Sequence, residues 1–157
     1  MSASEAATGI MTIRPFRPED QMPVRTLVLS GLGDHFGAVD ETMNPDLDDI
    51  AASYLRTGGR VIVAEVDGEI VGTGTLKPEA LGVGRLVRMS VAGHRRGKGI
   101  GRALVDALLA QARSDGYRRV VVETNDDWWD AIGLYRACGF QTDGYRDGDI
   151  HLSLELT

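Results

Sequence analysis

The stretch MSVAGHRRGKGIGRALVDALLAQARSDG, residues Met89–Gly116, decides how the rest of the chain is organised. Its first residues belong to the apolar run Leu86–Val91, which is typical of a β-strand. From Ile100 to Gln111, apolar side chains recur at the spacing of one helix face, and Gly116 suits the left-handed position just past a helix end. We therefore predict a strand, a glycine-rich loop and a long amphipathic helix.

The loop between this strand and this helix combines glycine with positive charge. The residues concerned are Arg95, Arg96, Gly97, Lys98, Gly99, Gly101 and Arg102. The first N–H groups of a helix lack intrahelical partners, and the aligned peptide dipoles make that end electropositive. Because glycine has no Cβ, it lets a phosphate approach the backbone closely. The loop therefore predicts a ligand that carries more than one phosphate group.

Two other phosphate-binding motifs do not fit these residues. A P-loop places four residues between its first glycine and Gly-Lys and then a Ser or Thr. Only three residues lie between Gly93 and Gly97, and Gly99 follows Lys98. A dinucleotide fingerprint requires a third glycine where Arg102 stands. The sequence therefore excludes both.

Composition limits the classes of function. The 157 residues suit one domain, and we expect residues 1–10 to be a flexible tail and residues 11–157 to be that domain. A net charge of −6 argues against a nucleic-acid or anionic-membrane partner and is compatible with a cationic substrate. Cys138 is the only cysteine, and there is no signal-peptide pattern or membrane-length apolar run, so we expect a cytoplasmic protein. The three histidines are scattered, which predicts no metal site.

The remaining elements follow from periodicity and turn residues. We expect helices around Val24–Val28 and from Asp46 to Gly58, with a glycine-rich acidic loop from Gly31 to Pro45 between them. The expected strands are Thr12–Arg17, Val61–Val66, Glu69–Leu76, Arg118–Thr124, Gln141–Arg146 and Ile150–Leu156, and Asp67-Gly68 predicts a two-residue hairpin turn between the second and the third. Asn125 is expected to cap a last helix over residues 128–138. The run Val120–Val122 suits a strand covered on both faces, as in a parallel crossover.

Two motifs resemble those of the GNAT superfamily of N-acetyltransferases. Met89-Ser90-Val91 followed by the Arg-x-x-Gly-x-Gly pattern of Arg96–Gly101 resembles its pyrophosphate-binding motif. Ala131–Phe140 is similar to its downstream Ala-x-x-Leu-Tyr-x-x-x-Gly-Phe pattern, although Trp128 stands where the family usually has asparagine. The resemblance implies an α/β (α+β) fold with a mixed, mostly antiparallel sheet. It also implies helices on both faces and a central, splayed parallel pair formed by the strands around Leu86–Val91 and Arg118–Thr124.

The resemblance also implies that the chain uses acetyl-CoA, without a metal. The residues that match the coenzyme site are Met89, Ser90, Val91, Arg96, Gly97, Lys98, Gly99, Ile100, Gly101, Arg102, Asn125, Trp128 and Tyr135. In the family, a backbone amide on the strand before the loop stabilises negative charge on the thioester oxygen, and the matching tyrosine protonates the leaving thiolate. For the base that takes the proton of the amine, we select Glu123, while Glu65 and a water chain remain alternatives.

The acceptor is expected to be a primary amine on a small molecule or a peptide. Asp34, His35 and Phe36, with Asp40 and Glu41, are candidates for an acidic, partly aromatic mouth, or they are ordinary solvated surface. A catalytically silent acyl-CoA sensor is the alternative function, and an acyl donor longer than acetyl-CoA is also open. Either a monomer or a homodimer is compatible with the sequence.

Overall fold

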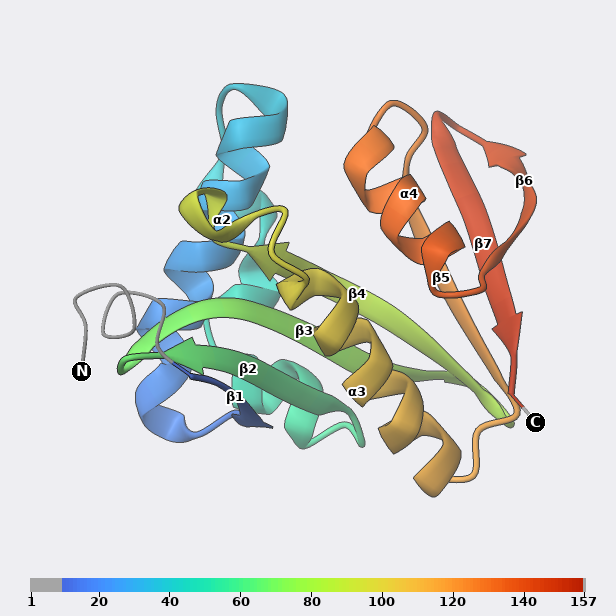
Figure 1. Ribbon diagram of the computed structural model, residues 1–157, viewed down its shortest axis with the longest axis horizontal. Helices are drawn as coiled ribbons and strands as arrows, with labels where there is room; N and C mark the ends of the chain where they lie inside the picture. The colour runs from blue at the N-terminus through green and yellow to red at the C-terminus, as the bar shows by residue number, and fades with distance from the viewer. Residues whose placement is uncertain (1–9, 157) are drawn as a thin grey trace.

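The computed structural model describes residues 10–156 and contains one seven-stranded sheet in the order β1-β2-β3-β4-β5-β7-β6 (Figure 1). The predicted tail falls on residues 1–9, outside the described part. The elements are β1 Met11–Pro15, α2 Gln21–Phe36, β2 Arg60–Val66, β3 Glu69–Ala80, β4 Val83–Val91, α3 Ile100–Ser114, β5 Arg119–Asn125, α4 Trp129–Ala137, β6 Gln141–Arg146 and β7 Asp149–Glu155.

The sheet is mixed and mostly antiparallel. Strands β1 to β4 form an antiparallel meander, with the predicted Asp67-Gly68 turn between β2 and β3. Helix α3 crosses over to β5, which runs parallel to β4, and β7 and β6 complete the sheet in antiparallel fashion. The predicted fold class, including the central parallel pair, is confirmed.

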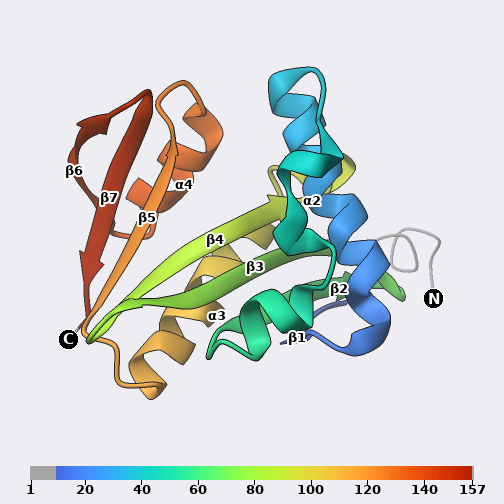
Figure 2. The same cartoon turned by 180° about the vertical axis from the view of Figure 1, so that it is seen from behind.

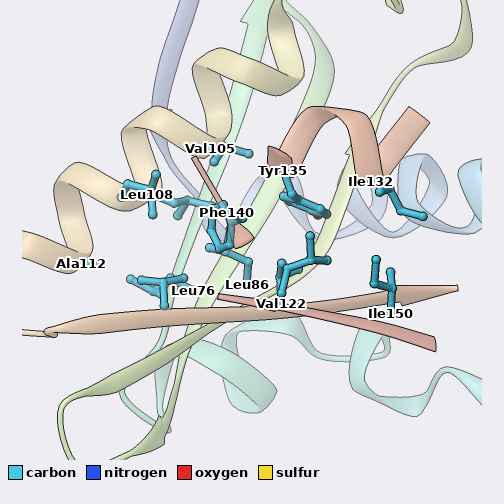
Figure 3. Packing of buried hydrophobic residues seen from close by; sticks show 13 residues of the cluster. Leu76, Leu86, Val105, Leu108, Ala112, Val122, Ile132, Tyr135, Phe140 and Ile150 are labelled. Carbon is cyan, nitrogen blue, oxygen red and sulfur yellow. The ribbon is translucent and has the colours of Figure 1, made fainter. Parts of the chain in front are cut away.

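Helices cover both faces of the sheet, whose central strands β2 and β3 carry buried side chains on both sides. Helices α3 and α4 pack on one face, over a cluster that includes Leu76, Leu108 and Val122 (Figure 3). Helix α2 lies on the other face, where Val24 and Val28 pack against Val63 of β2 (Figure 2). These layers bury the side chains that the sequence periodicity assigned to the core.

The expected loop from Gly31 to Pro45 is wrong in its first part, because α2 continues to Phe36. The helix ends at Gly37, which has φ +81° and donates its N–H to the carbonyl of Gly33 at 2.7 Å. Gly31 lies inside the helix for a packing reason. A Cβ there would come within 2.8 Å of Ser90 Oγ on β4, so glycine lets helix and strand approach closely.

The expected helix from Asp46 to Gly58 is also wrong. The chain forms short 3-10 turns at Glu41–Met43 and Pro45–Leu47 and a single π turn at Ala51–Leu55. The side chain of Gln21 donates to the carbonyl of Leu47 at 2.7 Å and accepts from the N–H of Ile50 at 2.9 Å. These tertiary bonds satisfy backbone groups that a regular helix would have paired internally.

Three element boundaries differ slightly from those expected from the sequence. Strand β3 continues through Pro78 to Ala80, and β4 begins already at Val83, so only Leu81-Gly82 turns between them. Helix α4 begins at Trp129, and no side chain in the described part of the chain caps it. The side chain of Asn125, the expected cap, instead donates to Asp149 of β7 at 3.0 Å.

Candidate functional site

The two parallel strands at the centre of the sheet separate after a short paired segment. They pair only through Val83–Arg119, Gly84–Val120 and Arg85–Val121, and then diverge (Figure 1). Strand β4 remains bonded to β3, and β5 remains bonded to β7. Within the described residues, the facing edges of 86–91 and 122–125 therefore have no strand partner. Their peptide groups are available to an extended ligand.

A cavity of about 760 Å³ occupies this split. Its lining includes Leu86, Val87 and Met89–Val91 from β4, Val122–Thr124 from β5, and residues of α2, α4 and the loop before α3. One open cleft therefore reaches both separated strand edges and the first turn of α3.

The loop before α3 has the geometry of an anion site. Gly97 and Gly99 have φ values of +76° and +82°, in the left-handed region that favours glycine. Gly99 is the N-cap of α3, and no side chain among residues 10–156 caps the first turn of this helix. A Cβ at either glycine would meet no atom within 4 Å, so the space in front of the backbone is open. This loop can receive phosphate oxygens.

Three arginines of the loop and of the first turn of α3 add positive charge to the cavity lining. The Nε of Arg95 is buried and has no hydrogen-bond partner among the described residues. Arg96 donates to the carbonyl of Val91 at 3.3 Å and lies 3.5 Å from Asp34, and Arg102 lies 3.6 Å from Asp106. An unsatisfied buried guanidinium N–H beside an uncapped helix start fits a bound diphosphate. Lys98 is exposed and lies outside the lining.

Tyr135 of α4 lines the same cavity from the side of β5. Its side chain is buried, and its ring meets the edge of Phe140 with centroids 5.7 Å apart (Figure 3). Burial raises the pKa of its hydroxyl well above the ordinary value near 10. The hydroxyl is therefore protonated at neutral pH and able to donate a hydrogen bond.

Glu123 lies on β5 at the cavity, with its side chain about half exposed. Its carboxylate is 3.6 Å from Arg85 of β4 and 3.4 Å from His151 of β7. The alternative base, Glu65, accepts a hydrogen bond from Arg14 at 3.0 Å and lies outside this cavity. Of the two carboxylates considered from the sequence, Glu123 is therefore the one that lies at the cleft.

The start of α4 and the end of α2 meet across the mouth of the cleft. The rings of His35 and Trp128 stack with centroids 4.0 Å apart and an angle of 7° between them. Phe36 meets Trp128 edge-on at 6.2 Å, and His35 lies 3.4 Å from Asp127. Trp128 lines the cavity, whereas His35, Phe36 and Asp34 lie outside its lining.

The structure brings most of the residues predicted from the motifs to one cavity. Its lining includes Met89, Ser90, Val91, Arg96, Gly97, Gly99, Ile100, Gly101, Arg102, Glu123, Trp128 and Tyr135. Asn125 does not reach it, because its amide is bonded to Asp149. Sequence reasoning missed Arg88 and the apolar positions Leu32 and Leu134. No sequence motif indicated Arg88. Leu134 belongs to the downstream motif and could have been predicted from it.

Comparisons with known proteins agree with this geometry. Residues 31–140 match the model of the acetyltransferase (GNAT) family. Rat N-acetyltransferase family 8 member 2 is 40% identical over 112 residues, which cover 68% of this chain and 50% of the relative. This chain thus spans about half the length of the curated relatives that it matches.

Two solved structures share the fold. The GNAT acetyltransferase of Staphylococcus aureus Mu50 superposes with a TM-score of 0.87 at 22% identity, covering 94% of this chain and 100% of its own. The PaiA N-acetyltransferase of Thermoplasma acidophilum, solved in complex with coenzyme A, gives 0.83 at 15% identity, with 93% and 99% covered. Over residues 10–156, no helix combines the length and apolar character needed to cross a membrane.

Proposed function

Because this chain belongs to the acetyltransferase (GNAT) family, we propose that it transfers an acetyl group from acetyl-CoA to a primary amine of a small molecule or a peptide. The amine attacks the thioester directly, with both substrates bound, in the cytoplasm. The observation that carries the proposal is the split between β4 and β5, which leads straight to the uncapped, glycine-lined start of α3. An extended arm and a diphosphate on one ligand match these two parts of the cleft.

The donor binds through main-chain groups and charge. The pantetheine arm lies along the unpaired edge of β4, as an added strand does at a sheet edge. The diphosphate lies on the loop Arg96–Arg102 and the first turn of α3, where N–H groups, the helix dipole and Arg95 attract it. The reacting thioester then lies between Met89–Val91 and Tyr135, both of which line the cavity.

The chemistry requires three groups near that point. An alkylamine is mostly protonated at neutral pH, and Glu123 accepts its proton directly or through a water. Negative charge grows on the thioester oxygen during attack, and a backbone N–H of Met89–Val91 donates to it. The departing thiolate accepts a hydrogen bond from Tyr135, whose burial keeps the hydroxyl protonated.

The acceptor enters between the end of α2 and the β6–β7 hairpin. Asp34 is already close to Arg96, Asp40 accepts bonds from Thr42, and Glu41 lies 3.7 Å from Arg25. The two arginines offset part of the negative charge of this loop. The loop therefore attracts a cationic amine less strongly than its sequence suggests.

The test incubates the purified protein, whether monomer or homodimer, with acetyl-CoA and each member of a library of amines. Release of the free thiol of coenzyme A is measured. Turnover with at least one amine supports the proposal, and repeating the assay with propionyl-CoA and succinyl-CoA defines the acyl group. Tight coenzyme A binding without turnover over the whole library would favour the silent acyl-CoA sensor instead.

The donor site has its own matched pair of variants. Coenzyme A should raise the melting temperature of the parent, because a ligand that binds only the native state stabilises it. Gly99→Glu should abolish this rise, since it places an anionic side chain at the start of α3. Gly116→Glu, at the other end of the same helix, is the control: its φ of +87° and its open surroundings match those of Gly99. Equal coenzyme A binding by both variants would refute the phosphate site.

Glu123→Gln tests the base. We expect the transfer rate at neutral pH to fall about tenfold or more, because a carboxamide cannot accept the proton. The coenzyme A affinity should change little. If the rate keeps its parental value and pH profile, a water chain to backbone carbonyls is the better assignment.

A further inference from the structure

Arg88 has an unusual backbone conformation for a residue inside a strand. Among residues 10–156, the non-glycine residues with positive φ are Asp67, Arg88 and Asp147. Asp67 and Asp147 lie in hairpin turns, each followed by a glycine. Arg88, with φ +54°, lies in the middle of β4, where L-residues rarely adopt the left-handed region. Such a conformation persists only where the surrounding structure holds it.

This conformation belongs to a β-bulge at the point where β4 borders the cleft. Val87 pairs with Thr75 and Ser90 with Thr73, so Arg88 and Met89 together face Gly74. Val87 packs on the α2 side of the sheet and Met89 on the α3 side. A bulge bends its strand and changes the direction of the peptide groups that follow it. Here those groups are the N–H groups of Met89–Val91, beside the cavity.

The side chain of Arg88 is anchored to a segment far away in the sequence. Its Nε and Nη2 donate to the two carboxylate oxygens of Asp46 at 2.9 and 2.6 Å, and Nη2 also donates to Asn44 Oδ1 at 3.0 Å. Tyr54 donates its hydroxyl to the same carboxylate. About a quarter of each charged side chain is exposed. A bidentate, partly buried pair of this kind fixes both position and orientation.

We propose that Arg88 and Asp46 form a positioning pair, which holds the bulge of β4 so that a backbone N–H within Met89–Val91 faces the reacting thioester. The proposal rests on the proposed acetyl transfer. It predicts that the anchor affects the chemical step more than donor binding, because the phosphate loop begins only after Val91 and makes its own contacts. Neither Arg88 nor Asp46 takes part in proton transfer.

Arg88→Ala and Arg88→Gly separate backbone positioning from other roles. Both remove the guanidinium, but glycine adopts positive φ without steric cost, whereas alanine does not. We expect Arg88→Ala and Asp46→Ala to lower the single-turnover transfer rate about 10- to 100-fold, with acetyl-CoA affinity changed only a few-fold. Arg88→Gly should recover most of the rate that Arg88→Ala loses. Equal losses in both Arg88 variants, with a raised KM for the amine, would overturn the proposal in favour of direct substrate contact.

Arg14→Ala is the matched control. Arg14 on β1 also donates to both oxygens of an aspartate, Asp20, at 2.8 and 3.0 Å, but it lies away from the cleft. This variant should lose stability without losing transfer rate per folded molecule. If Arg88→Ala behaves in the same way, the Arg88–Asp46 pair is only structural and the proposal fails.

A measurement that does not depend on turnover tests the positioning role separately from the proposed acetyl transfer. Amide hydrogen exchange and NMR shifts of Met89–Val91 should change in Arg88→Ala and return toward parental values in Arg88→Gly. Parental values in Arg88→Ala would overturn the positioning role even if no amine is ever acetylated. Absence of turnover in the parent, with these shifts behaving as expected, would instead count against the acetyl transfer alone.

Discussion

The paired and the separated halves of the β4–β5 ladder differ although the same two strands form both. In the paired half, Gly84 and Val120 are buried, and Val120 belongs to the core cluster that also contains Leu76 and Leu108, so the sheet is closed there. In the separated half, the space between the strands is lined instead by side chains from α2 and α4, and it stays open as a cavity. The comparison shows that a binding cleft arises where two neighbouring strands stop pairing with each other while each remains paired with its outer neighbour.

The bulge at Arg88 lies in the separated half, three residues beyond the last β4–β5 pair at Arg85. Strand β5 has no register shift against β7 up to Asn125, so the irregularity belongs to the β4 side. The two borders of the cleft are therefore not equivalent. One is a regular strand that carries Glu123, and the other is a bent strand held by a distant ion pair.

The largest effect is expected from the hydroxyl that faces the separated half. In water, proton transfer from tyrosine to a thiolate is uphill by about 1.5 pKa units, and burial of Tyr135 widens that gap. Tyr135 therefore assists as a hydrogen-bond donor, and Tyr135→Phe should lower the single-turnover rate about 100-fold with little change in acetyl-CoA affinity.

Tyr117→Phe is the control for this prediction, because Tyr117 packs at the closed end of the ladder, near Gly84. It should leave the transfer rate unchanged. A Tyr135→Phe rate within threefold of the parent would reduce Tyr135 to a packing residue.

The next prediction compares the two halves of the ladder by making the same change, glycine to alanine, once in each half. A Cβ at Gly74, opposite the bulge, would lie 2.5 Å from Met89 Sδ, and one at Gly84, in the paired half, would lie 2.8 Å from Leu76 Cδ1. Both Gly74→Ala and Gly84→Ala should lower the free energy of unfolding by about 1–3 kcal/mol. Only Gly74→Ala should also slow transfer per folded molecule, since it displaces the bulge. Denaturation and single-turnover assays measure the two effects, and equal transfer rates would contradict the distinction.

A pH prediction concerns the anchor of the bulge. Burial and the hydrogen bond to Asp46 raise the pKa of Tyr54 from 10.0 to about 12. A raised folded-state pKa stabilises the protein below pH 10, and that contribution is lost as the pH rises through 12. The stability difference between the parent and Tyr54→Phe should therefore shrink by about 2 kcal/mol over this range, as followed by urea denaturation. A difference that is independent of pH would contradict the assigned shift.

The smallest effect is expected at the mouth of the cleft. Trp128 stacks on His35, whereas its neighbour Trp129 is 73% exposed. Trp128→Ala should lower the free energy of unfolding by about 1 kcal/mol, and Trp129→Ala should change it little. Thermal denaturation of the two variants makes the comparison, and similar losses would show that the stack between α2 and α4 contributes nothing specific.

The sequence by itself determined the features that depend on neighbours in the chain. Gly97 and Gly99 need positive φ, and the apolar spacing after Ile100 makes one helix face, so loop and helix were predictable from local rules. The Asp67-Gly68 hairpin followed in the same way, as did the parallel strand, which was expected over Arg118–Thr124 and lies at Arg119–Asn125. The resemblance to the GNAT motifs predicted the splayed pair of strands.

Only the tertiary structure decided the features that depend on distant partners. Helix α2 continues past Gly31 and Gly33 because it packs closely on Ser90, and the segment after Pro45 forms irregular turns because Gln21 bonds to its backbone. Arg88 adopts a positive φ in a strand and is bound to Asp46, 42 residues away. Local propensity favours a loop at the first of these places, a regular helix at the second and a regular strand at the third. Long-range hydrogen bonds and close packing outweigh that preference, and no short window of sequence contains both partners.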